Sequence, residues 1–143
     1  MFQRILVAID PSDARRTALL TAGRMAQLTK ADVHVLHVVA SAVTAGTVMV
    51  LEEENEGRAI LDESLAELHG LGVKADGRLV HGLTTEVPAL ISAAAEDFQA
   101  DLLIVSPHHR SAVSAFFNPR VSDAVAHASR IAVLLAPEEP AKP

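Results

Sequence analysis

The chain has 143 residues, of which 50% are apolar and 21% are charged, and its formal net charge is −6. This length suits one domain with a single buried core, and so large an apolar share excludes a disordered chain. The sequence contains no cysteine, which excludes disulfides, zinc–thiolate sites and thiol catalysis. The negative charge disfavours binding to nucleic acid or to an anionic membrane surface.

The start of the chain leads directly into an apolar run at residues 5–9, without the pattern of a signal peptide. No apolar stretch in the sequence approaches the roughly 20 residues that a membrane-spanning helix needs. We therefore expect a cytoplasmic protein.

Five short apolar runs predict the strands of a sheet. They are rich in Val, Ile and Leu and do not alternate strictly with polar residues, which is typical of parallel strands buried on both faces. The runs are residues 5–9, 33–39, 73–80, 102–105 and 131–135.

Four amphipathic segments between these runs predict helices. We expect Ser12 to cap the first helix, which runs to about Thr29. Gly57 lies in the first half of the second helix and is expected to weaken that half. Leu61, Leu65 and Leu68 mark the core face of the second helix. We expect Thr84 or Thr85 to cap the third helix, with Pro88 in its first turn. The fourth helix is expected to open at Asn118 and Pro119.

The alternation of strands and helices predicts a doubly wound α/β sandwich with right-handed crossovers. We expect a single domain over residues 1–137, with a five-stranded, mostly parallel sheet and four helices. Residues 138–143 are rich in proline and charge, and we expect them to form a flexible C-terminal tail. Residues 40–50 have no firm period, so they either fold over a cleft or form only an irregular connection.

In an open parallel sheet, ligands bind beyond the carboxyl ends of the strands, where the strand order reverses. Asp10 directly follows the first strand, so its carboxylate is placed to accept hydrogen bonds from a sugar hydroxyl or an amine. The alternative is that Asp10 accepts backbone N–H bonds at the start of the following helix. His34 and His37 are three residues apart on one strand and point to opposite faces, so we expect no metal site.

Five motifs follow one another along nearly the whole chain: RILVAIDPS at residues 4–12, LHVV at 36–39, VHG at 80–82, ADLLIV at 100–105 and VSDAV at 121–125. In this order and spacing they resemble the universal stress protein family. The resemblance implies a homodimer, commonly paired through the last strand, here residues 131–136. It also implies, for many family members, that ATP or another adenine nucleotide such as AMP occupies the cleft.

The resemblance assigns the nucleoside to Asp10, with the adjoining Pro11 and Ser12, and to the backbone near Val38. It assigns the phosphates to a loop of the form Gly-x-x-Gly, nine residues, then Gly-Ser. Glycine suits such a loop because the chain comes close to the phosphates and needs positive φ, while exposed N–H groups hold the anion.

This chain departs from the family's loop at all four positions, where it has Ser106, His109, Pro119 and Arg120. Pro119 has no N–H to donate, and His109 brings a ring into the space that a phosphate would use. The chain therefore looks closer to the branch of the family that lacks this loop and does not bind ATP.

The same segment offers cations, namely His108, His109, Arg110 and Arg120. They could bind a different anion by charge, such as a small phosphate, a cyclic nucleotide or a sulfate. The alternative is that the two arginines are solvated, or pair with Asp123 or with the partner subunit.

No nucleophile–base pair is visible in the sequence, so we do not expect an enzyme. We predict a non-catalytic, dimeric stress-response or regulatory module that acts through an unknown regulatory protein partner and lacks tight ATP binding. The alternative is a switch that binds a nucleotide or a small anion in the cleft at the carboxyl ends of the strands.

Overall fold

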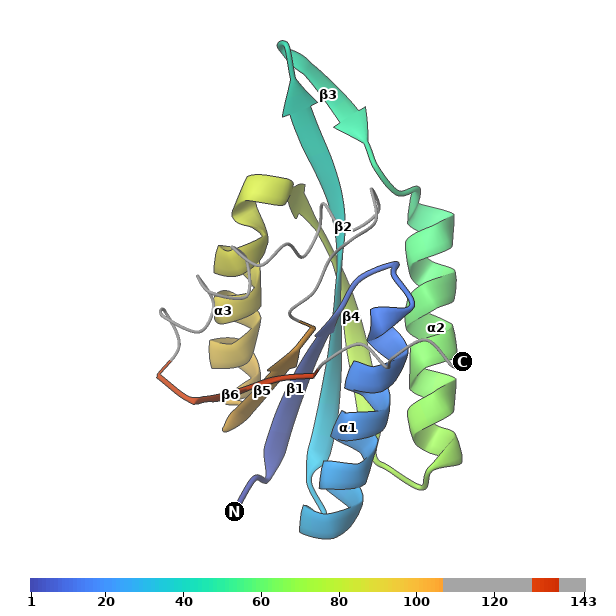
Figure 1. Ribbon diagram of the computed structural model, residues 1–143, viewed down its shortest axis with the longest axis vertical. Helices are drawn as coiled ribbons and strands as arrows, with labels where there is room; N and C mark the ends of the chain where they lie inside the picture. Colours follow the sequence, from blue (N-terminus) through green and yellow to red (C-terminus); the bar gives the residue numbers. More distant parts are fainter. Residues whose placement is uncertain (107–129, 137–143) are drawn as a thin grey trace, which may run out of the picture.

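The structure is a computed structural model, and it describes residues 1–106 and 130–136. In this part of the chain, helices pack on both faces of a central sheet (Figure 1). In chain order the elements are β1 (Arg4–Ile9), α1 (Ala14–Thr29), β2 (Asp32–Thr44), β3 (Thr47–Val50), α2 (Glu54–Gly70), β4 (Ala75–Leu83), the 3-10 turn η1 (Thr84–Glu86), α3 (Val87–Phe98), β5 (Leu102–Val105) and β6 (Ala132–Leu135).

The sheet confirms the predicted α/β fold. Strands β4, β2, β1, β5 and β6 lie side by side in that order, and each neighbouring pair is parallel. A sixth strand, β3, pairs antiparallel with the end of β2 and was not predicted. The predicted fourth helix, which begins at Asn118, and the predicted tail lie outside the described residues.

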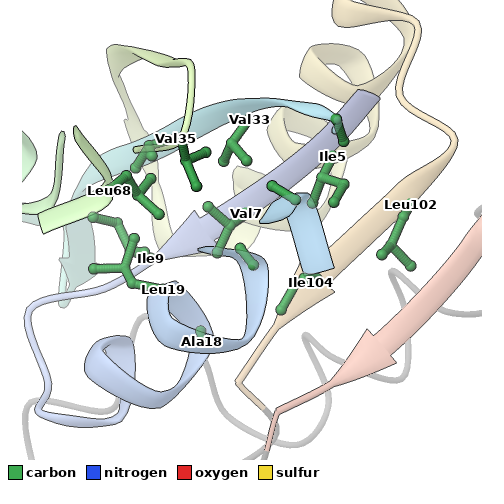
Figure 2. Packing of buried hydrophobic residues seen from close by; sticks show 14 of the residues in the cluster. Ile5, Val7, Ile9, Ala18, Leu19, Val33, Val35, Leu68, Leu102 and Ile104 are labelled. Atoms are coloured by element: carbon green, nitrogen blue, oxygen red, sulfur yellow. The ribbon is translucent and has the colours of Figure 1, made fainter. Parts of the chain in front are cut away.

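The core forms because the strands are apolar on both faces. Alternate side chains of β1, such as Ile5, Val7 and Ile9, pack against α1 and α2 in one cluster, which Figure 2 shows from close by. The intervening Leu6 and Ala8 pack in a second cluster against α3. The sheet is therefore buried on two sides, as the continuous apolar runs predicted.

Residues 40–50 form a regular β-hairpin, so they are not an irregular connection. Strand β2 continues to Thr44, and the chain turns back at Ala45 and Gly46 into β3. Both turn residues have positive φ, 51° for Ala45 and 77° for Gly46, as a two-residue type I′ hairpin turn requires. The hairpin extends beyond the body of the sheet (Figure 1).

Two predictions about helix starts are wrong. Ser12 does not cap α1, because its backbone N–H and hydroxyl both donate to the carboxylate of Asp10. No side-chain cap bond from a threonine precedes α3 in the described structure; instead the Glu86 carboxylate accepts the Leu83 N–H at 2.7 Å. Pro88 does lie in the first turn of α3, as predicted.

Gly57 has a packing role in α2 that its helix propensity did not indicate. It is buried in the first turns of this helix, where the helix lies close against the sheet. A Cβ atom added at Gly57 would lie 2.7 Å from Val39 Cγ2 and 3.3 Å from Leu79 Cδ1. Glycine is therefore the residue that lets α2 pack at this distance.

Candidate functional site

The strand order reverses between β1 and β5. From β1 the chain builds the sheet outward through β2 and β4 on one side, and through β5 and β6 on the other. Such a reversal leaves a crevice at the carboxyl ends of the two central strands, where open α/β sheets bind ligands. Asp10 follows β1 directly and Ser106 follows β5, so both lie at this edge.

Asp10 is buried, with 2% of its surface exposed. Its Oδ1 accepts two hydrogen bonds from Ser12, one from the backbone N–H at 2.8 Å and one from the hydroxyl at 2.5 Å. The carboxylate thus organises the turn that leads into α1, which is the alternative that the sequence left open for it. Any ligand that uses Asp10 must share or replace these bonds.

The rest of the loop after β1 is tied to α1. The guanidinium of Arg15 donates to the carbonyl oxygens of Pro11 and Ser12, at 3.0 and 3.1 Å. Arg15 also lies 3.8 Å from Glu63 of α2. Pro11 and Ser12 therefore have their carbonyl groups occupied by protein donors.

Ser106 lies at the same edge of the sheet, directly after β5. It is 4% exposed, and its hydroxyl donates to the carbonyl oxygen of Ala14, the first residue of α1, at 3.4 Å. The Ser106 side chain thus lies between the end of β5 and the start of α1. Val38 is buried on the α3 face of β2, one residue beyond the last pair in the β1–β2 ladder, Ile9 and His37.

The structure therefore brings Asp10, Pro11, Ser12 and Ser106 to the carboxyl ends of β1 and β5, and places Val38 in the middle of β2, level with the end of β1. The other two predicted site residues, His109 and Arg120, lie outside the described residues. So do His108, Arg110, Pro119 and Asp123, so the predictions on the loop stay predictions.

A buried pair that the sequence did not indicate lies beside this edge. His37 Nε2 is 2.9 Å from Glu52 Oε2, and the two side chains are 0% and 2% exposed. The other ring nitrogen, Nδ1, is 3.2 Å from the carbonyl oxygen of Ile9. The pair links the segment before α2 to the end of β1, one residue before Asp10.

His34 and His37 point to opposite faces of β2, as predicted. The His34 ring stacks on Phe98 of α3, with ring centroids 5.0 Å apart, whereas His37 faces Gly57 of α2. Among residues 1–106 and 130–136, no three acidic or histidine side chains are grouped as ligands for a metal ion. No helix in this part of the chain is both long and apolar enough to cross a membrane.

A cavity of about 470 Å³ opens on the α2 side of the sheet, next to the buried pair. Hairpin residues and the acidic start of α2 both contribute to its lining, which includes Ser41, Val50, Glu52, Glu53, Glu54 and His81. The mixture of carboxylates and apolar side chains suits a ligand that carries positive charge.

The family model described as the universal stress protein family matches residues 1–137. The chain belongs to this family. The sequence motifs therefore identified the family correctly. A comparison with curated proteins gave no match.

Solved universal stress proteins share the fold. One from Burkholderia pseudomallei is 26% identical, with a TM-score of 0.72, over 93% of this chain and 94% of that chain. A universal stress protein in complex with cAMP is 23% identical, with a TM-score of 0.72, over 96% and 99%. One from Archaeoglobus fulgidus in complex with dAMP is 20% identical, with a TM-score of 0.69, over 93% and 96%.

Proposed function

We propose that this universal stress protein is a non-catalytic regulatory module that acts through protein contacts and does not bind ATP tightly. The observation that carries the proposal is the position of Ser106. It stands where ATP-binding members of the family have the first glycine of the phosphate loop, and its buried side chain lies between β5 and α1. Side-chain atoms at this position occupy space that a glycine would leave for a phosphate.

The hydrogen bonds around Asp10 support the same proposal. Asp10 Oδ1 accepts two bonds from Ser12, and the carbonyl groups of Pro11 and Ser12 accept bonds from Arg15. These contacts stabilise the loop after β1 without a ligand. A loop whose polar groups are already hydrogen-bonded within the protein forms fewer new hydrogen bonds with a nucleotide than a loop whose polar groups face solvent.

The module acts as a homodimer in this proposal, paired through residues 131–136. Strand β6 pairs with β5 alone among the described strands, and none of these strands covers its outer, open edge. Leu135 in this strand is 44% exposed, although it is a large apolar side chain. A second β6 strand would bind the open edge and cover this leucine.

The second candidate function is a switch that binds an adenine mononucleotide. Two proteins of the same fold were solved with cAMP and with dAMP, which have one phosphate each. A mononucleotide needs Asp10 and the backbone near Val38, but it needs less of the phosphate loop than ATP does. The loop substitutions should therefore lower the affinity for a mononucleotide less than the affinity for ATP.

Calorimetric titration distinguishes the two functions. We would titrate the full chain with ATP and magnesium, AMP, cAMP and dAMP, and repeat each titration with the Asp10→Ala variant. The regulatory module predicts no low-micromolar binding of any of them. Mononucleotide binding that Asp10→Ala abolishes, and that Asp13→Ala at an exposed neighbouring aspartate retains, would establish the switch instead.

A further inference from the structure

The β2–β3 hairpin presents an apolar surface without charge. Four of its apolar side chains are more than half exposed: Val43 (56%), Val48 (60%), Met49 (53%) and Val50 (64%). No residue from 40 to 51 is charged. Exposed edge strands of monomeric proteins usually carry a charge or a proline that blocks pairing, and β3 has neither.

The outer edge of β3 has hydrogen-bonding groups available for another strand. The turn at Ala45 and Gly46 makes Thr44 and Thr47 the first hydrogen-bonded pair, and bonded pairs then alternate along the hairpin. The N–H and C=O groups of Val48 and Val50 consequently point away from β2. Among the described residues β3 pairs with β2 alone, so a strand added here would bond to Val48 and Val50.

The acidic cavity adjoins this edge directly. We use that name for the cavity of about 470 Å³ lined by Val39, Ser41, Val50, Glu52, Glu53, Glu54, Asn55 and His81. Val50 belongs both to the edge strand and to the cavity wall, so one bound segment would contact both. His81 Nε2 lies 3.9 Å from Glu54 Oε1, which leaves the cavity with more carboxylates than cations among its described lining residues.

Glu52 indicates which kind of chemical group the acidic cavity would bind. Its side chain is 2% exposed, and Oε2 is bonded to His37. The other oxygen, Oε1, has no hydrogen-bond partner among the residues that the structure describes. A buried carboxylate oxygen without a donor is costly, and a cationic N–H group entering the cavity would satisfy it.

We propose that the β3 edge and the acidic cavity together bind an extended, basic segment of a partner protein. The segment adds to β3 as a strand, through Val48 and Val50, and a lysine or arginine side chain enters the cavity toward Glu52. A second copy of the hairpin fits less well, because residues 41–57 contain four glutamates and no lysine or arginine. Charge complementarity therefore favours a partner of different sequence.

A defined peptide tests this site on the full chain. The probe is a fluorescein-labelled octapeptide of alternating valine and lysine, and its binding is followed by fluorescence anisotropy. We expect saturable binding that weakens at least about fivefold between 50 and 300 mM salt, because screening reduces charge attraction. The same peptide with glutamate in place of lysine should not bind, and equal binding of both peptides would overturn the proposal.

Charge-matched variants show whether the cavity is the site. Glu53→Gln with Glu54→Gln should weaken binding of the lysine peptide about tenfold. Asp62→Asn with Glu67→Gln removes the same charge from exposed positions farther along α2 and should leave the affinity unchanged. An equal loss in both double variants would mean attraction by net charge alone and would contradict the proposal.

The strand pairing has its own test. Val48→Pro removes an outward N–H without removing a bond between β2 and β3, and should weaken binding about tenfold, whereas Val48→Thr should not. Amide hydrogen exchange of the unaltered chain gives a second measurement that requires no variant. Protection of the Val48 and Val50 amides by the bound peptide supports strand addition, and unchanged exchange at both amides refutes it.

Discussion

His37 Nε2 and Glu52 Oε2 are 2.9 Å apart, and both side chains are buried. The Ile9 carbonyl can only accept a hydrogen bond, so His37 Nδ1, 3.2 Å away, carries a proton. Both ring nitrogens of His37 therefore have a polar partner inside the core, which is how this imidazole remains buried.

Removing one partner of this pair should cost much of the protein's stability. Glu52→Ala leaves His37 buried without a partner at Nε2, and we expect the free energy of unfolding to fall by about 3 kcal/mol. The control is Glu54→Ala, since Glu54 is 66% exposed and lies 3.9 Å from the exposed His81; it should cost less than about 1 kcal/mol. Urea unfolding measures both, and equal losses would contradict a structural role for the buried pair.

The two glycines of α2 should respond to alanine in opposite directions. Gly57→Ala places a Cβ 2.7 Å from Val39 Cγ2, so helix or strand must shift, at a cost of about 1–3 kcal/mol. Gly70→Ala has no atom within 4 Å of the added Cβ and should stabilise the same helix by about 0.5–1 kcal/mol. Thermal unfolding measures both changes. A stabilising Gly57→Ala would show that α2 does not lie this close to the sheet.

The pairing of the protein in solution should depend on β6. Leu135→Arg places a charge on the exposed edge strand and should convert a dimer into a monomer. Leu28→Arg adds the same charge at a leucine of α1 that is 83% exposed, and should leave the dimer intact. Sedimentation velocity gives the mass of each variant. Unchanged dimers in both variants would mean that the subunits pair elsewhere.

The sequence predicted the parallel sheet because its signals are local and repeated. Apolar runs such as residues 5–9 and 102–105 are buried on both faces. Family motifs such as RILVAIDPS then identified the family, which the match over residues 1–137 confirms.

The hairpin and the buried pair could not be predicted in the same way. The turn uses Ala45 and Gly46, and an alanine with positive φ is not a usual hairpin signal. The distance between His37 and Glu52 depends on that turn, because the two residues are 15 positions apart and the hairpin brings the chain back beside β2. Ser12 was expected to cap α1, but Asp10 two residues before it is a stronger acceptor for its N–H and hydroxyl.

Rebuilding the family's phosphate loop tests the central claim most directly. The variant combines Ser106→Gly, His109→Gly, Pro119→Gly and Arg120→Ser, and ATP with magnesium is titrated into it and into the unaltered chain by calorimetry. We predict no low-micromolar binding by the unaltered chain and a gain of at least about tenfold in the rebuilt one, since glycines let backbone N–H groups reach the phosphates. Low-micromolar ATP binding by the unaltered chain would contradict the proposal that this protein regulates without tight ATP binding.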